Sequence, residues 1–172
     1  MALSMHEIAL PVFRQQFGAL GEILDQTRTH AEARELDPAI YLEARLSPDM
    51  FTRAAQVRQA TDHVQRCIAK LTDTDELSFD VEEETIDYWQ GRINTTRDYM
   101  EAAPPEKFEG TEDKPIELVT RVRTMHFPGR HYVLHFVFPQ FLFHVTTAYD
   151  IARGAGVPLG KRHYLGNIPQ SV

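Results

Sequence analysis

The feature that most constrains this chain is a long segment without strong charge near its C-terminal end. Residues 132–149 contain no Asp, Glu, Lys or Arg, and apolar side chains occupy every face of the helix that they would form. A helix of this kind is either buried in a helical bundle or spans a membrane. The segment, taken as residues 131–153, therefore reduces the choice to these two classes of fold.

Polar residues within this segment argue against a membrane span. Residues 132–149 reach the lower length limit for crossing a bilayer. However, the segment also contains His135, Pro139, Gln140 and His144, each of which is costly in hydrocarbon. The mean hydropathy of the whole chain is −0.37. We therefore interpret residues 131–153 as a core helix.

The composition limits the binding partners that the protein could have and the cellular compartment in which it could act. A chain of 172 residues is predicted to form a single domain over residues 1–172. The net charge of −7 argues against nucleic acid and anionic membrane surfaces as partners. The single cysteine, Cys67, permits no internal disulfide, and the N-terminal residues lack a secretion signal. We therefore expect a cytoplasmic protein.

Two helices are predicted in the N-terminal half. Ser4 and Glu7 have the spacing of a capping box, and the helix that follows is expected to reach about Ala33 with a kink at Pro11. Residues 39–43 are predicted to form a short helical piece after the Asp37-Pro38 turn. Ser47-Pro48 has the pattern of a second helix start, and that helix is expected to end near Leu71. The apolar face of the first helix is formed by Leu10, Phe13, Phe17, Leu20 and Leu24, and the seam of the second helix by Met50, Ala54, Val57, Thr61, Val64, Ile68 and Leu71.

The C-terminal half adds a third helix, a hairpin and the core helix. The third helix is expected over residues 82–102, beginning with the acidic run 82–84. Residues 116–127 are rich in β-branched side chains and predict one or two short strands. Gly154 or Gly156 is expected to end the core helix, and the tail 157–172 to lie over the surface.

The predicted fold class is therefore mainly α: a four-helix bundle with a short β-hairpin or extended segment before the last helix. The long connections at 34–47 and 103–130 allow a wiring other than simple up-and-down.

His144 is the first candidate for chemistry. It lies within the core helix, and Gln140 precedes it by one turn on the same face. A buried imidazole can bind zinc, nickel or iron, although catalytic zinc needs about three protein ligands. Alternatively, His144 is a core histidine that forms a hydrogen bond to a neighbouring hydroxyl or carbonyl.

Other polar residues are weaker candidates. His131 and His135 have a spacing that could share an ion. A kink at Pro139 could open a polar pocket or could only curve the helix around its neighbours. His63 lies near Gln56 and Gln59, but its angle from the apolar seam predicts a solvated flank. A central pocket is expected to draw on Gln56, Gln59, His135 and Trp89. Cys67 is expected to be an inert buried thiol.

The chain resembles a bacterial family of unknown function in the DinB/YfiT-like superfamily of four-helix-bundle putative metalloenzymes. The resemblance covers nearly the whole chain. It is carried by Pro11-Val12-Phe13, His30-Ala31-Glu32-Ala33-Arg34, Pro48-Asp49-Met50-Phe51, Leu134-His135-Phe136, Pro139, Phe141, Phe143 to Tyr149 and Gly156 to Arg162.

This resemblance implies a DinB-like bundle, a homodimer, and a metal site in an incomplete form. In metal-binding relatives, a histidine of the second helix joins two histidines from an HxxxHxGQ pattern of the last helix. That pattern falls here on residues 140–147, where Gln140 replaces the first histidine, His144 matches the second and Thr147 replaces the glutamine. The second-helix ligand would be near Gln56, Gln59 or His63.

Three functional hypotheses follow. The first is a DinB-like protein with a degraded metal site, acting through a central pocket or through protein–protein contacts. The second is a divalent-metal enzyme, of hydrolase or thiol-transferase type, that uses His144 as a ligand. The third is a carrier for a small apolar molecule held among Phe136, Phe141, Phe143 and Trp89.

Overall fold

Helix α1 (Met5–Glu32) begins at the predicted capping box. In this computed structural model, which describes residues 3–80 and 84–169, the Ser4 hydroxyl accepts a hydrogen bond from the Glu7 amide. The Glu7 carboxylate in turn accepts one from the Ser4 amide at 2.9 Å. The helix continues through Pro11. All five predicted apolar positions are buried, namely Leu10, Phe13, Phe17, Leu20 and Leu24.

The short helix α2 (Ala39–Glu43) lies where it was predicted, but the next helix begins later than expected. Helix α3 (Arg53–Thr72) starts after Thr52, whose side chain accepts a hydrogen bond from the Ala55 amide. The prediction of a start at Ser47-Pro48 is therefore wrong. The Ser47 hydroxyl is instead bound to Asp49 at 2.6 Å, within a local turn. A residue suited to capping is equally suited to a turn.

Helix α4 (Ile86–Glu101) begins after Thr85, which accepts a hydrogen bond from the Tyr88 amide. This start lies four residues beyond the predicted position. Of the acidic run expected at the helix start, Glu84 is exposed and precedes the cap, while Glu82 and Glu83 lie outside the described residues.

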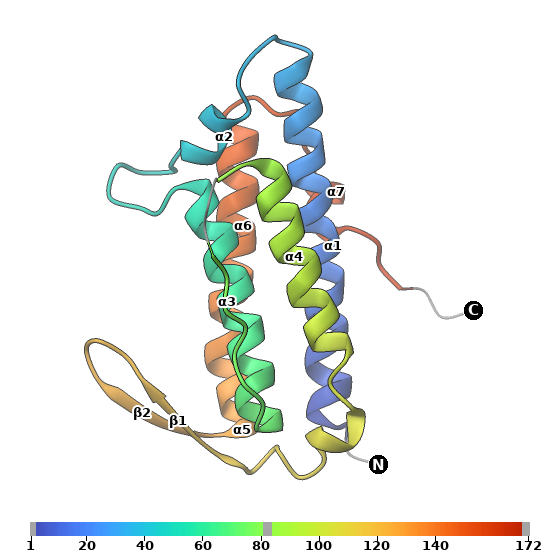
Figure 1. Ribbon diagram of the computed structural model, residues 1–172, viewed down its shortest axis with the longest axis vertical. Helices are drawn as coiled ribbons and strands as arrows, with labels where there is room; N and C mark the ends of the chain where they lie inside the picture. Colours follow the sequence, from blue (N-terminus) through green and yellow to red (C-terminus); the bar gives the residue numbers. More distant parts are fainter. Residues whose placement is uncertain (1–2, 81–83, 170–172) are drawn as a thin grey trace.

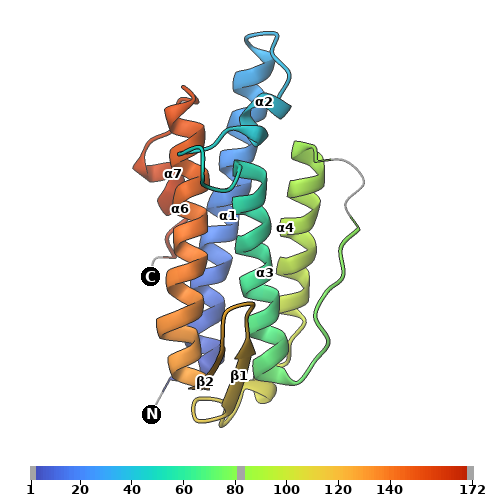
Figure 2. The same ribbon diagram turned by 90° about the vertical axis from the view of Figure 1, so that its left-hand side faces the viewer.

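The four long helices form a bundle with an up–down–down–up wiring (Figures 1 and 2). Helices α1 and α6 run in one direction, and α3 and α4 in the other. The predicted long connections do not cause this arrangement, because each joins two antiparallel helices. The connection between α3 and α4 does so, since it returns along the bundle before α4 begins (Figure 1).

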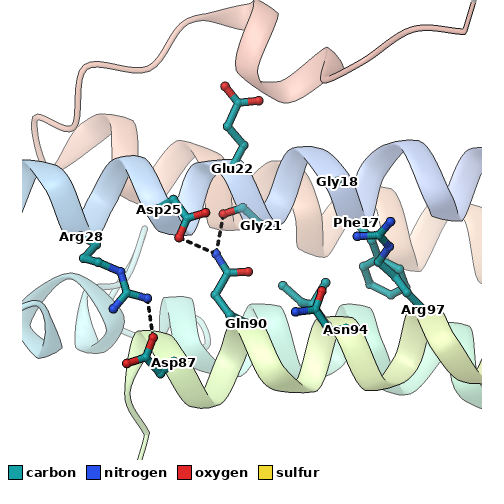
Figure 3. A pocket seen from close by; sticks show the side chains of 11 residues that line it. Phe17, Gly18, Gly21, Glu22, Asp25, Arg28, Asp87, Gln90, Asn94 and Arg97 are labelled. Carbon is teal, nitrogen blue, oxygen red and sulfur yellow. Dashed lines mark hydrogen bonds and ion pairs between the residues drawn. The ribbon is translucent and has the colours of Figure 1, made fainter.

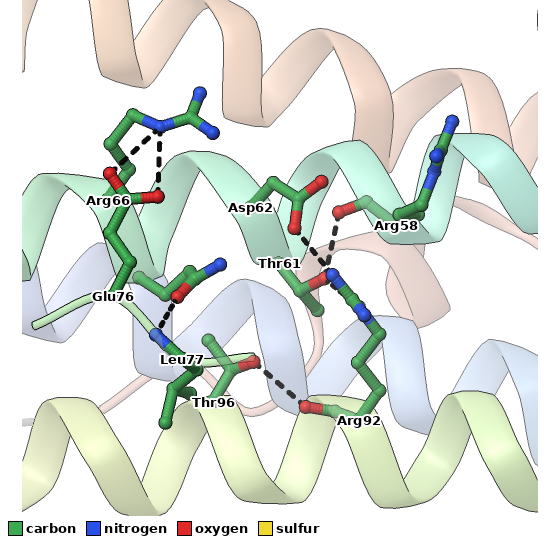
Figure 4. A network of polar contacts seen from close by, with 9 residues as sticks. Arg58, Thr61, Asp62, Arg66, Glu76, Leu77, Arg92 and Thr96 are labelled. Atoms are coloured by element: carbon green, nitrogen blue, oxygen red, sulfur yellow. Dashed lines mark hydrogen bonds and ion pairs between the residues drawn. The ribbon is translucent and has the colours of Figure 1, made fainter. Parts of the chain in front are cut away.

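Polar side chains fix this returning segment to α3 and α4 (Figure 4). The Leu77 amide donates to Gln65 Oε1 at 2.5 Å. The Arg92 guanidinium lies 3.8 Å from the centre of the Phe79 ring and donates to Asp62 at 2.5 Å. Arg92 is buried, where an unpaired charge would be costly, and Asp62 supplies the opposite charge. The contacts join residues distant in sequence and hold the two parallel helices together.

A β-hairpin precedes the last long helix, as predicted, and lies beside one end of the bundle (Figure 1). The short 3-10 helix Pro105–Phe108 leads to strands β1 (Pro115–Val119) and β2 (Thr124–Pro128), which pair antiparallel with Ile116 opposite Phe127. Helix α5 (Gly129–His131) follows directly. A Cβ atom at Gly129 would lie 1.9 Å from the Thr111 carbonyl oxygen, so only glycine fits at this junction.

The final long helix has a wider turn in front of its proline. A π-helical segment, Tyr132–Val137, precedes helix α6 (Phe138–Gly154), and the Phe138 amide bonds to the Val133 carbonyl five residues earlier. Pro139 then occupies the first turn of α6, where its missing N–H is tolerated. Contrary to the prediction of a helix buried on every face, Leu134 and Phe143 are 41% and 52% exposed. No helix of a four-helix bundle is central.

The C-terminal segment is more ordered than the predicted surface tail. Val157 and Leu159 are buried, and a short helix α7 (Lys161–Leu165) packs on α1. The Gln15 side chain donates to the Leu165 carbonyl at 2.8 Å. Among the described residues, no helix combines the length and the apolar character that a membrane crossing requires.

Candidate functional site

Helix α3 is buried along two faces. The predicted seam faces the bundle core, whereas a second row of buried residues faces α6 and comprises Gln56, Ala60, His63 and Cys67. His63 is only 9% exposed, so its predicted position on a solvated flank is wrong. The angular argument failed because it assumed one buried face, while a bundle helix packs against two neighbours. The spacing of residues 56, 60, 63 and 67 was the signal that could have identified this second face.

Gln56 fixes the orientation and the tautomer of His144. The Gln56 amide nitrogen donates to the Phe51 carbonyl at 3.4 Å, which turns its carbonyl oxygen toward α6. That oxygen lies 2.6 Å from His144 Nδ1. Because an amide oxygen only accepts, Nδ1 must carry the proton, and Nε2 keeps its lone pair. This contact with a carbonyl oxygen is of the kind that the core-histidine alternative expects.

His63 stacks on His144. The two ring centres lie 5.5 Å apart and the planes differ by 16°. Burial lowers the pKa of each imidazole to about 4, and in His63 the nearby His144 and Arg66 add to this effect. Both rings are therefore neutral at pH 7, and their unprotonated nitrogens are available as acceptors or as metal ligands.

Two phenylalanines flank the stacked rings. Phe136 contacts His63 edge-on at 5.9 Å between ring centres, and Phe143 contacts His144 in the same manner at 5.4 Å. Within the described part of the chain, His144 Nε2 and the ring nitrogens of His63 have no hydrogen-bond partner. These ring nitrogens are partly exposed to solvent. The fully enclosed polar atoms without a partner all belong to other described residues. The site thus combines unpaired acceptors with apolar walls.

The other predicted site residues are not joined to this cluster. Gln140 is half-buried one turn before His144, and its side chain forms no hydrogen bond with the described residues. Gln59 is half-buried, and His135 is exposed beside His131. Trp89 is completely buried on α4. The structure therefore brings together Gln56, His63 and His144 and leaves His135 and Trp89 apart from them.

The cluster does not supply the ligands of a complete zinc site. Two neutral imidazoles are present, but the described residues contain no group of three His, Cys, Asp or Glu side chains placed to share an ion. Catalytic zinc ordinarily has three protein ligands. The oxygen of Gln56 is already engaged by His144. The residues thus fit at most a two-nitrogen site.

The packing argues against the apolar-carrier hypothesis and against Cys67 as a nucleophile. Phe141 and Trp89 are fully buried in the core, whereas Phe143 is half-exposed, so these side chains do not surround one space. Cys67 is also fully buried, and burial raises the pKa of its thiol. The protonated thiol is a poor nucleophile, which agrees with the predicted inert role.

A separate cavity of about 600 Å³ lies between α1 and α4 (Figure 3). Nothing in the sequence predicted it. Four of its polar side chains pair with one another: Arg28 pairs with Asp87 at 2.6 Å, and Gln90 donates to Asp25 at 2.9 Å. It contains neither histidine nor cysteine. The α3–α6 cluster therefore remains the better candidate for chemistry.

Comparison with known proteins places the chain in a family. The model of the domain of unknown function DUF1993 matches residues 5–165. The chain belongs to the DUF1993 family. In structure this DUF1993 chain is similar to a DinB family member protein from Shewanella denitrificans, whose crystal structure was determined at 1.83 Å resolution. The TM-score is 0.88 and the identity 27%, over 98% of this chain and 95% of that one.

No curated protein matches the DUF1993 chain. The predicted membership of a DinB-like family of unknown function, and the DinB-like bundle fold, are confirmed. The correspondence of Gln140, His144 and Thr147 to the metal-binding pattern of relatives stays a prediction.

Proposed function

We propose that this DinB-like bundle binds a small neutral molecule at His63 and His144 and recognises it by accepting hydrogen bonds. The observation that supports the proposal is the Gln56–His144 hydrogen bond of 2.6 Å, which makes Nε2 an acceptor. Gln56 fixes the tautomer, and the nitrogen that is left unprotonated has no hydrogen-bond partner among the described residues.

The chemistry of the cluster defines the class of ligand. The unprotonated nitrogen of a neutral imidazole disfavours anions and accepts hydrogen bonds from hydroxyl, thiol or amide N–H groups. Arg66 lies close enough to His63 to lower its pKa, and it disfavours a cationic ligand for the same reason. The edge contacts of Phe136 and Phe143 favour an apolar body next to the donor group.

Binding of benzyl alcohol and of toluene tests this class, because only the first carries a hydrogen-bond donor. Both are titrated into ¹⁵N-labelled protein while the amide signals of α3 and α6 are followed. Benzyl alcohol is expected to bind at least about 10-fold more tightly than toluene, which corresponds to one buried hydrogen bond.

His144→Leu should remove this difference, and His135→Leu, which changes an exposed histidine of the same segment, should preserve it. Equal affinity for the two probes, or a difference that persists in His144→Leu, would count against recognition by the histidine pair.

A divalent-metal function is the second candidate. Metal-bound histidines usually donate their other N–H to a carbonyl oxygen, and the Gln56–His144 contact has this form. His63 and His144 would hold the ion, and a bound metal would supply Lewis-acid chemistry of hydrolase or thiol-transferase type. Elemental analysis of untagged protein, followed by incubation with zinc, nickel and iron salts, tests it. About one ion per chain, lost in His144→Leu, would favour this candidate over the first.

We also propose that the protein acts in the cytoplasm as a homodimer. The acidic composition, the single buried cysteine and the exposed Phe51 and Phe143 support this proposal. Light scattering coupled to size-exclusion chromatography measures the mass in solution, for which twice 19.7 kDa is expected.

A further inference from the structure

The first residue of α3, Arg53, carries a buried positive charge that the described residues do not balance. Its side chain is completely enclosed. One nitrogen, Nη2, donates to the Ile23 carbonyl at 3.3 Å, while Nε and Nη1 are enclosed without a partner. The Ile23 carbonyl is shared, because the Thr27 hydroxyl also donates to it at 2.7 Å. No carboxylate of the described chain forms an ion pair with Arg53.

An unpaired guanidinium in this position is energetically unfavourable. Burial lowers the pKa of Arg53 to about 10, so the group stays protonated at pH 7. A buried charge is normally paired, and it strongly destabilises a fold when its partner is missing. The other buried arginine, Arg92, shows the usual solution, since its guanidinium is bound to Asp62. Among the described residues, Arg53 has no equivalent carboxylate.

We propose that Arg53 binds a small oxyanion, a carboxylate or a phosphate group, inside this end of the bundle. A planar guanidinium binds two oxygens of such a group through Nη2 and one neighbouring nitrogen, as Arg14 does with Glu101 through Nε and Nη2. In Arg53 the second N–H of Nη2 and the unpaired Nε or Nη1 supply such a pair. Arg53 precedes Gln56 by three residues on α3, and its guanidinium reaches the Ile23 carbonyl of α1. The site is nevertheless distinct from the histidine pair, because it has a different donor and the opposite preference for charge.

Thermal unfolding in different anions tests the proposal at constant pH and ionic strength. Sodium phosphate and sodium acetate are compared with sodium chloride for the wild type, Arg53→Met and Arg58→Met. Arg58 is exposed on the same helix, so Arg58→Met loses the same charge without touching the site. Because the guanidinium is enclosed, binding requires a local opening, and samples are equilibrated before heating.

At an anion concentration about 100-fold above the Kd, the Tm of the wild type and of Arg58→Met is expected to rise relative to chloride. This rise should exceed the rise of Arg53→Met by about 5 °C or more. A gain in phosphate alone identifies a phosphate group, and a gain in acetate identifies a carboxylate. In chloride, Arg53→Met is expected to be at least as stable as the wild type, since it removes an unpaired buried charge.

Equal shifts in all three proteins would indicate a general salt effect or an adventitious ion only, and would overturn the proposal. If Arg53→Met does not fold, Arg53→Lys replaces it. Its affinity for the anion is expected to be at least about 10-fold weaker, because an ammonium group lacks the paired N–H donors of the guanidinium. Equilibrium dialysis of labelled phosphate and acetate against wild-type protein provides a result that needs no variant. Binding of neither anion contradicts the proposal. His144→Leu should keep the anion response. Failure of the function proposed for the histidine pair can therefore be distinguished from failure of the Arg53 proposal.

Discussion

The stability of the protein is expected to fall between pH 8 and pH 5 because two buried histidines must remain neutral. The pKa of His63 and of His144 is about 4 in the folded protein, compared with about 6.5 in the unfolded chain. The unfolded chain therefore binds more protons below pH 6.5. The stability contributed by the neutral rings is complete above the unfolded pKa and is lost as the pH falls toward the folded pKa.

The size of the loss follows from these pKa values. At pH 5 each histidine favours the unfolded chain by about 2 kcal/mol relative to pH 8, and the pair by about 4 kcal/mol. With an m-value of about 2 kcal/mol/M, the midpoint of urea unfolding is expected to drop by about 2 M. Carboxylates with lowered pKa, such as Asp87 and Glu101, titrate mainly below this range.

Urea unfolding at pH 8, 6.5 and 5 measures the effect. The variant His63→Gln/His144→Gln is expected to lose most of the pH dependence, while the control His135→Gln should retain it because that side chain is exposed. His30 also has a lowered pKa, caused by its burial and by Arg34, so a small dependence will persist in the double variant. If the double variant keeps the wild-type dependence on pH, the rings are not neutral and buried as described.

Three further outcomes are expected. Asp62→Asn should destabilise the fold by about 3 kcal/mol in urea unfolding, because it leaves the buried Arg92 without its counter-charge. A loss below about 1 kcal/mol, the value of an exposed ion pair, would mean that the pair is solvated. Native Cys67 should not react with Ellman's reagent, since burial raises the pKa of its thiol, whereas urea-unfolded protein should react fully; rapid labelling of the native state would show that the α3–α6 interface opens. Phe141→Ala should cost about 3 to 5 kcal/mol and Phe143→Ala about 0.5 kcal/mol or less, in line with their burial; similar losses would refute the assigned packing.

Local sequence signals predicted most of the fold. The capping box at Ser4 depends on two residues three apart, and the apolar seam of α1 on neighbours within one helix. The predicted helix start at Ser47 failed because the same hydroxyl can stabilise a turn, and Thr52, five residues later, took the role of the cap. Such competition is decided by what the next residues pack against.

Long-range contacts decided the features that the sequence did not predict. The wiring depends on the segment after α3, which is fixed by contacts such as Leu77 with Gln65 and Phe79 with Arg92. The site was missed in part for a similar reason. His144 and Gln56 were both candidates, but only the packing of α3 against α6 shows that they bond and that His63 lies on the same face.

The tautomer and charge of His144 provide the most direct test of the site described here. Long-range ¹H–¹⁵N correlation spectra of the histidine rings, recorded from pH 5 to pH 8, distinguish the two neutral tautomers and the imidazolium. His144 is predicted to be neutral at pH 5.5, with its proton on Nδ1 next to Gln56. A proton on Nε2, or a charged ring at pH 5.5, would remove the unpaired acceptor on which the proposed recognition depends.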